Sequence, residues 1–99
     1  MNEKRQHPRR PHVAPIVVTI GGARHDAESR DLSIGGMFVR TALTPAFGTD
    51  VTVEITLPNV GVTKIAAIVR WTTPEGFGVQ FGMLGARETN AVSLLIADS

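Results

Sequence analysis

Short β-branched stretches separated by glycine and proline run through most of the chain, and they restrict the folds that it can adopt. The sequence has ten glycines and six prolines among 99 residues, and turn signals recur about every eight to twelve residues, the spacing of short antiparallel strands. Residues 51–57 alternate strictly between apolar and polar side chains, as a strand with one buried face does. A chain of this length supports one core. We therefore predict a single small antiparallel sheet or barrel over residues 13–99.

The last segment of the chain changes to a helical period. Apolar side chains recur there at helical spacing, at Ala91, Val92, Leu95 and Ile96. The pattern predicts an amphipathic helix over residues 86–97 that covers one end of the barrel. Gly85 is the expected N-cap, because no serine, threonine, aspartate or asparagine directly precedes the segment.

Several classes of function are disfavoured by what the sequence lacks. It contains no cysteine, which removes disulfides and thiol catalysis and suits a reducing cytoplasm. No apolar stretch is long enough to span a membrane, and the first residues include no secretory apolar region. His7, His12 and His25 show no recognised metal-ligand spacing, and no nucleophile–base pair is indicated. We therefore expect a cytoplasmic protein that is neither an enzyme nor a metalloprotein.

The first twelve residues are strongly basic. They contain Lys4, Arg5, Arg9 and Arg10 against one acid, whereas the remainder has more acids than bases. We expect residues 1–12 to form a flexible arm that meets an anion such as a phosphate, a nucleic acid or an acidic protein surface. If the arm is extended, Arg5 and Arg9 lie roughly 13 Å apart at about 3.3 Å per residue, which suits a ligand with several separated acceptors. A solvated tail without a partner is the alternative.

The stretch Asp31-Leu32-Ser33-Ile34-Gly35-Gly36 combines a carboxylate, a hydroxyl and two glycines. If it continues the strand before it, Asp31 and Ser33 point to the same side. Asp31 could then accept from the N1–H and N2–H₂ of a guanine, and Ser33 could donate to a phosphate or brace the turn. Gly35 and Gly36 allow a close approach of the backbone. The same residue types also form Asx-type turns that serve structure alone.

Trp71 and three glycines are each open to two interpretations. Trp71, the single tryptophan, could flank a purine or anchor the long strand that it ends. Gly76, Gly78 and Gly82 leave the face of the strand over residues 77–81 opposite Phe77 and Phe81 largely bare. This bare face fits either close approach by a ligand or another backbone, or relief of twist in a curled barrel.

Taken together, these motifs resemble those of the PilZ domain family. The family's RxxxR motif is similar to "RQHPR", Arg5 to Arg9, and its [D/N]xSxxG motif is similar to Asp31, Ser33 and Gly36. The stretches "MFVRT", "AAIVRW" and "GFGVQFGML" resemble the family's core strands, so the likeness covers nearly the whole chain. The resemblance implies a six-stranded antiparallel, PilZ-like split β-barrel with a C-terminal α-helix, and binding of the bacterial second messenger cyclic di-GMP.

The resemblance also implies roles for individual residues. Arg5 and Arg9 would contact the phosphates and the guanine faces, and Asp31 would accept from a guanine edge. Ser33 would bond near that edge, and Gly36 would keep the site open. The secondary candidates for ligand binding are Lys4, Arg10, Arg30, Gly35 and Trp71. In the family, the residue ahead of the first arginine, here Lys4, is linked to whether one nucleotide or a stacked pair is held.

We therefore expect a non-enzymatic cyclic di-GMP receptor or effector domain that needs no cofactor. Ligand binding would order the arm and signal to an unidentified partner protein, with control of motility as one possible setting. The alternative is an interaction adaptor on the same fold that does not depend on cyclic di-GMP. A barrel that binds single-stranded nucleic acid would need exposed aromatic platforms. Since Phe77 and Phe81 are assigned to the core, we expect no DNA or RNA partner. We also expect no membrane insertion, because no apolar stretch is long enough for it.

Overall fold

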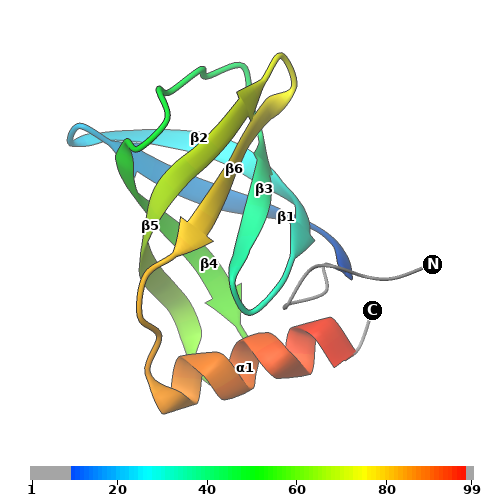
Figure 1. Cartoon of the computed structure of the whole chain (residues 1–99). Coiled ribbons are helices and arrows are strands. Elements are labelled where there is room, and N and C mark those ends of the chain that lie inside the picture. The colour runs from blue at the N-terminus through cyan, green and yellow to red at the C-terminus, as the bar shows by residue number, and fades with distance from the viewer. Residues whose placement is uncertain (1–9, 98–99) are drawn as a thin grey trace.

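The computed structural model describes residues 10–97, which fold into six strands and one helix (Figure 1). The strands are β1 Arg10–Ile20, β2 Ala23–Leu32, β3 Gly36–Arg40, β4 Asp50–Leu57, β5 Gly61–Thr73 and β6 Gly76–Phe81, and the helix is α1 Ala86–Ala97. Every strand pair is antiparallel, and the order β1-β2-β3-β6-β5-β4 closes through pairing of β1 with β4. The predicted six-stranded antiparallel barrel with a C-terminal helix is confirmed.

Strand β1 begins three residues earlier than the expected boundary between arm and barrel. Arg10 pairs with Leu32 and Pro11 pairs with Asp31 in the ladder between β1 and β2. The sequence pattern placed the boundary at Val13 because the β-branched apolar run begins there. A proline is tolerated near the start of a strand, where its missing N–H is not needed.

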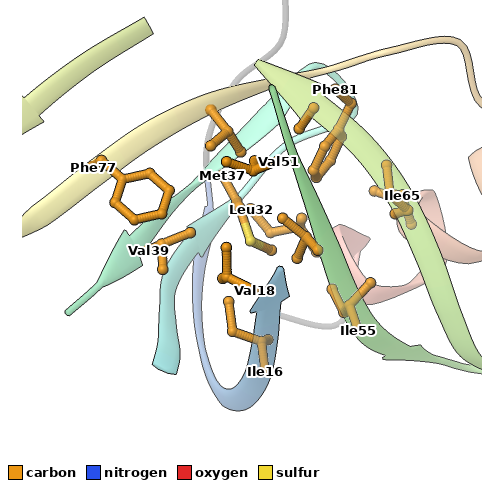
Figure 2. Packing of buried hydrophobic residues seen from close by; sticks show 14 of the residues in the cluster. Ile16, Val18, Leu32, Met37, Val39, Val51, Ile55, Ile65, Phe77 and Phe81 are labelled. Carbon is orange, nitrogen blue, oxygen red and sulfur yellow. The ribbon is translucent and has the colours of Figure 1, made fainter. Parts of the chain in front are cut away.

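The barrel interior is filled by inward side chains from all six strands (Figure 2). In β4, the four apolar residues of the alternating stretch, Val51, Val53, Ile55 and Leu57, are all buried, as the pattern predicts. Full burial of a valine or leucine side chain stabilises a fold by roughly 1.5–3 kcal/mol. The alternation therefore selects the buried face of the strand, and its four buried side chains contribute to the stability of the core.

Helix α1 covers one end of the barrel, below the ends of β4 and β5 in Figure 1. It begins and ends at the residues that the helical period predicts. Ala91 and Val92 are buried and belong to the core cluster. The carbonyl of Gly85 accepts the first helical hydrogen bond, from the N–H of Thr89 at 2.9 Å, which is the N-cap position expected for this glycine. Within residues 10–97 no helix is both long enough and apolar enough to cross a membrane.

Candidate functional site

A β-bulge in β2 turns Asp31 to the outside of the barrel. Ser29 pairs with Val39 of β3, which is part of the core cluster. Asp31 pairs with Phe38, which is not part of that cluster, and the register shifts between the two pairs. Regular alternation would place Ser29 and Asp31 on the same, inward face. Because Arg30 is an extra residue against β3, both Arg30 and Asp31 lie on the outer face instead.

A second bulge, in β5, has the same effect on Trp71. Val69 pairs with Val79 on the inner face, Trp71 pairs with Gly78 on the outer face, and Arg70 is the extra residue between them. Trp71 is 41% exposed. A Cβ atom on Gly78 would collide with the indole ring of Trp71. The bare face that the sequence showed at Gly78 is therefore filled by a side chain of the neighbouring strand.

Phe38 lies between these two bulges and completes an aromatic surface on the outside of the barrel. Its ring centroid is 6.4 Å from that of Trp71, with an angle of 33° between the planes. The guanidinium carbon of Arg30 lies 3.8 Å from the centroid of Phe38. Phe38 is only 1% exposed, so Arg30 and Trp71 present the accessible surface. We call Arg30, Phe38 and Trp71 the outer platform, because guanidinium and indole planes are surfaces on which nucleic bases stack.

Asp31 stands beside the outer platform and is tied to it. Its Oδ1 accepts a hydrogen bond of 3.0 Å from the backbone N–H of Phe38. This bond orients the carboxylate next to the ring that Arg30 covers. An ionised carboxylate accepts several hydrogen bonds through its two oxygens, so the same group can bind β3 and a ligand together.

Ser33 closes the turn that joins β2 to β3. It is 3% exposed, and its Oγ accepts hydrogen bonds of 3.1 Å from the N–H groups of Gly35 and Gly36. Strand β2 ends one residue before Ser33, so the strand face that Asp31 and Ser33 were expected to share does not extend to Ser33. A Cβ atom on Gly36 would collide with the carbonyl oxygen of Val79. Close packing of β3 against β6 therefore requires glycine at this position.

The other predicted ligand residues lie at the N-terminal side of this site or outside the described residues. Arg10 is exposed at the start of β1, and its Cα pairs with that of Leu32, next to Asp31 along β2. The predicted contacts of Lys4, Arg5 and Arg9 fall on residues 1–9, which lie outside the described part of the chain. Their roles stay predictions.

The comparison with protein families decides between the possible kinds of barrel. The family model of the PilZ domain matches residues 3–97, a span that includes both sequence motifs. This chain belongs to the PilZ domain family. No curated protein sequence matches this PilZ domain closely enough to count as a relative.

Solved structures similar to this PilZ domain include three that illustrate the fold. The PilZ domain of CeSA from a cellulose-synthesizing bacterium has a TM-score of 0.73 at 18% identity, covering 92% of this chain and 96% of that one. The inhibitor of motility MotI (DgrA) of Bacillus subtilis has a TM-score of 0.79 at 21% identity, covering 98% and 51%. The PilZ domain of YcgR from Escherichia coli, solved with c-di-GMP, has a TM-score of 0.76 at 14% identity, covering 97% and 91%. At these identities the likeness establishes the fold.

Phe38 belongs to the site of this PilZ domain but was not predicted from the sequence. The available signal was the run Met37-Phe38-Val39, three apolar residues in succession. In a strand with one buried face, the middle residue of such a run points to solvent unless something covers it. Here the outer face is covered by Arg30 and Trp71, so the run marked a strand with two covered faces.

Proposed function

We propose that this PilZ domain is a non-enzymatic receptor for cyclic di-GMP. The observation on which the proposal depends is the position of Asp31, which the β2 bulge turns to the outer face beside the outer platform. Similar solved structures that contain c-di-GMP include the PilZ domain of Escherichia coli YcgR and the PlzA protein of Borreliella burgdorferi. They support the choice of this ligand for a barrel of the same fold.

The chemistry of cyclic di-GMP suits the residues of this face. Each guanine has two adjacent donors on its Watson–Crick edge, N1–H and N2–H₂, which match the two oxygens of the Asp31 carboxylate. The planes of Arg30 and Trp71 offer stacking surfaces for the purine rings. The two phosphates of the ligand are matched in our proposal by Arg5 and Arg9, whose guanidinium groups bind phosphate oxygens in pairs.

In this proposal the nucleotide draws the basic N-terminal arm against the outer face of the barrel. Fixing the backbone of each residue costs roughly 1–2 kcal/mol, and the charge-assisted contacts of the arm must offset that cost. We therefore expect a micromolar dissociation constant, which corresponds to a binding free energy on the order of −8 kcal/mol. The ordered arm would form a surface for a partner protein, and a cytoplasmic location and a role in motility control belong to the same proposal.

Isothermal titration calorimetry with cyclic di-GMP tests the receptor proposal. We expect saturable heat for the wild type, and a loss of affinity of at least about tenfold in both Arg5→Ala and Arg9→Ala, because each removes a charge-assisted contact. Asp26→Ala is the matched control: it removes an exposed carboxylate from the same strand as Asp31 and should leave the affinity unchanged.

Absence of binding heat in a folded wild-type protein would contradict the receptor proposal. If such a protein still captured a partner without nucleotide, and the arginine variants captured it equally well, the adaptor function would replace the receptor function. Circular dichroism of each variant separates a loss of binding from a loss of the barrel.

A further inference from the structure

Ser29 is a buried polar side chain next to the bulge that exposes Asp31. It is 0% exposed. Its hydroxyl donates to the carbonyl oxygen of His12 at 2.5 Å and accepts from the N–H of Ala14 at 3.1 Å. The Nδ1 atom of the His12 ring also lies 3.1 Å from Ser29 Oγ. Because the hydroxyl proton is used on the His12 carbonyl, Nδ1 of His12 acts as the donor in that third contact.

These contacts bridge a bulge in the neighbouring strand β1. Between the pairs Pro11–Asp31 and Ala14–Ser29, β1 has two residues where β2 has one. A bulge leaves backbone groups outside the ladder, and a buried backbone group without a partner is costly. The hydroxyl of Ser29 supplies partners to the backbone at both sides of the irregular segment, at residues 12 and 14.

The two irregular ladders meet at one residue, Arg30. It is the single residue of β2 opposite the widened segment of β1, and it is the extra residue of β2 against β3. Ser29 precedes it and is the last residue of β2 in regular pairing before the shift. Ser29 therefore fixes β1 to β2 at the residue where the bulge of β2 against β3 begins.

We propose that Ser29 is a positioning residue for ligand binding, which maintains the bulge that places Asp31 on the outer face. The consequence for affinity rests on the proposed cyclic di-GMP function, whereas the consequence for the Asp31 position does not. Without the hydroxyl, β1 and β2 lose the bridge across the bulge. Regular pairing of β2 with β3, which would turn Asp31 inward, then competes with the bulged form of β2.

The test compares Ser29→Ala with two control variants in the full chain. Ser93→Ala removes a half-buried hydroxyl that donates to a carbonyl within helix α1, away from the bulge. Val53→Ala creates a cavity in the core on strand β4, away from the bulge. Calorimetry with cyclic di-GMP should show about tenfold weaker binding for Ser29→Ala, and changes within about twofold for both controls.

Two further readouts distinguish positioning from a general loss of stability. Amide hydrogen exchange at Phe38, whose N–H donates to Asp31 Oδ1, should accelerate in Ser29→Ala more than exchange at Ile55 in β4 does. In an Asp31→Ala background, the substitution Ser29→Ala should weaken binding by less than about twofold, because its effect acts through Asp31. Ser29→Cys keeps a weak hydrogen-bonding group and should bind with intermediate affinity, which provides a folded variant if Ser29→Ala does not fold.

The outcomes separate this inference from the proposed function. Wild-type affinity in Ser29→Ala, or in Ser29→Cys if only that variant folds, would overturn the positioning role alone. Full additivity of the Ser29 and Asp31 substitutions would also overturn it. If the wild type itself does not bind cyclic di-GMP, the receptor proposal fails, and unchanged exchange at Phe38 would then reject the placement of Asp31 by Ser29 as well.

Discussion

The backbone N–H of Phe38 donates a hydrogen bond of 3.0 Å to Oδ1 of Asp31. This bond joins the backbone of β3 to a side chain of β2 at the point where the ladder between the two strands shifts register. A side chain thus provides the partner for a backbone donor next to the bulge, and the same bond sets the orientation of the carboxylate. The proposed ligand group and the local strand pairing are therefore coupled.

Asp31→Asn and Asp31→Ala separate these two roles of the carboxylate. An asparagine keeps one oxygen for the N–H of Phe38, but it replaces the charge and the second acceptor that the guanine edge needs. Both variants should bind cyclic di-GMP at least about tenfold more weakly than the wild type. Only Asp31→Ala should also lose stability, by about 1–3 kcal/mol. Calorimetry and thermal unfolding measure the two effects, and equal stability of the two variants would contradict the bridging role.

Gly78→Ala should displace Trp71, since a Cβ atom there overlaps the indole ring. Overpacking of this kind typically costs about 1–3 kcal/mol. Trp71 is the single tryptophan, so its fluorescence reports the displacement directly, and affinity for cyclic di-GMP should fall with it. Gly82→Ala is the matched control. A Cβ atom on Gly82 would lie 3.4 Å from the carbonyl oxygen of Ala66, which is an ordinary van der Waals contact. An unchanged emission spectrum in Gly78→Ala would show that the packing described for Trp71 is wrong.

Ser33→Ala should lower the stability of the barrel through its turn. The substitution removes the acceptor for the N–H groups of Gly35 and Gly36, and leaving such groups without a partner costs about 1–3 kcal/mol. For a domain of this size each kcal/mol lowers Tm by about 4–8 °C. The control Ser93→Ala removes a half-buried hydroxyl that donates to a carbonyl within the helix, and it should change Tm little. Equal Tm values for Ser33→Ala and the wild type would contradict the bracing role.

Arg30→Lys tests whether the planar guanidinium of the outer platform matters beyond its charge. Lysine keeps the charge but loses the plane that lies over Phe38. We expect cyclic di-GMP affinity to fall by about fivefold, within the range of a lost stacking contact. Arg40→Lys, a substitution at another exposed arginine of the barrel, should leave affinity unchanged. If Arg30→Lys binds as tightly as the wild type, charge alone explains the contribution of Arg30.

The regular parts of the fold could be predicted because their periods repeat. Strict alternation over residues 51–57 selected the buried face of β4, and the helical spacing after Gly85 gave the bounds of α1. In both cases burial on one side of a regular element determines which positions are apolar. The start of β1 at Arg10 was missed because the paired residues there include Pro11, which weakens a strand pattern.

The geometry of the site could not be predicted in the same way, because it depends on two bulges. Arg30 and Arg70 are ordinary residues in sequence, and nothing in the residues around them marks an extra position in a ladder. Alternation continued through Arg30 would send Asp31 inward, and the same rule through Arg70 would send Trp71 inward. The motif identified Asp31, and the family resemblance identified Trp71 as a secondary candidate, but only the strand pairing shows that both reach the outer face.

The most direct test of the central claim is a nuclear magnetic resonance titration of the full chain with cyclic di-GMP. We predict saturable shifts in the amides of residues 31–36 and of Phe38, and in the indole N–H of Trp71, together with shifts in residues 5–10. Shifts confined to other faces of the barrel, or no shifts at saturating nucleotide, would contradict a ligand site built on Asp31 and the outer platform.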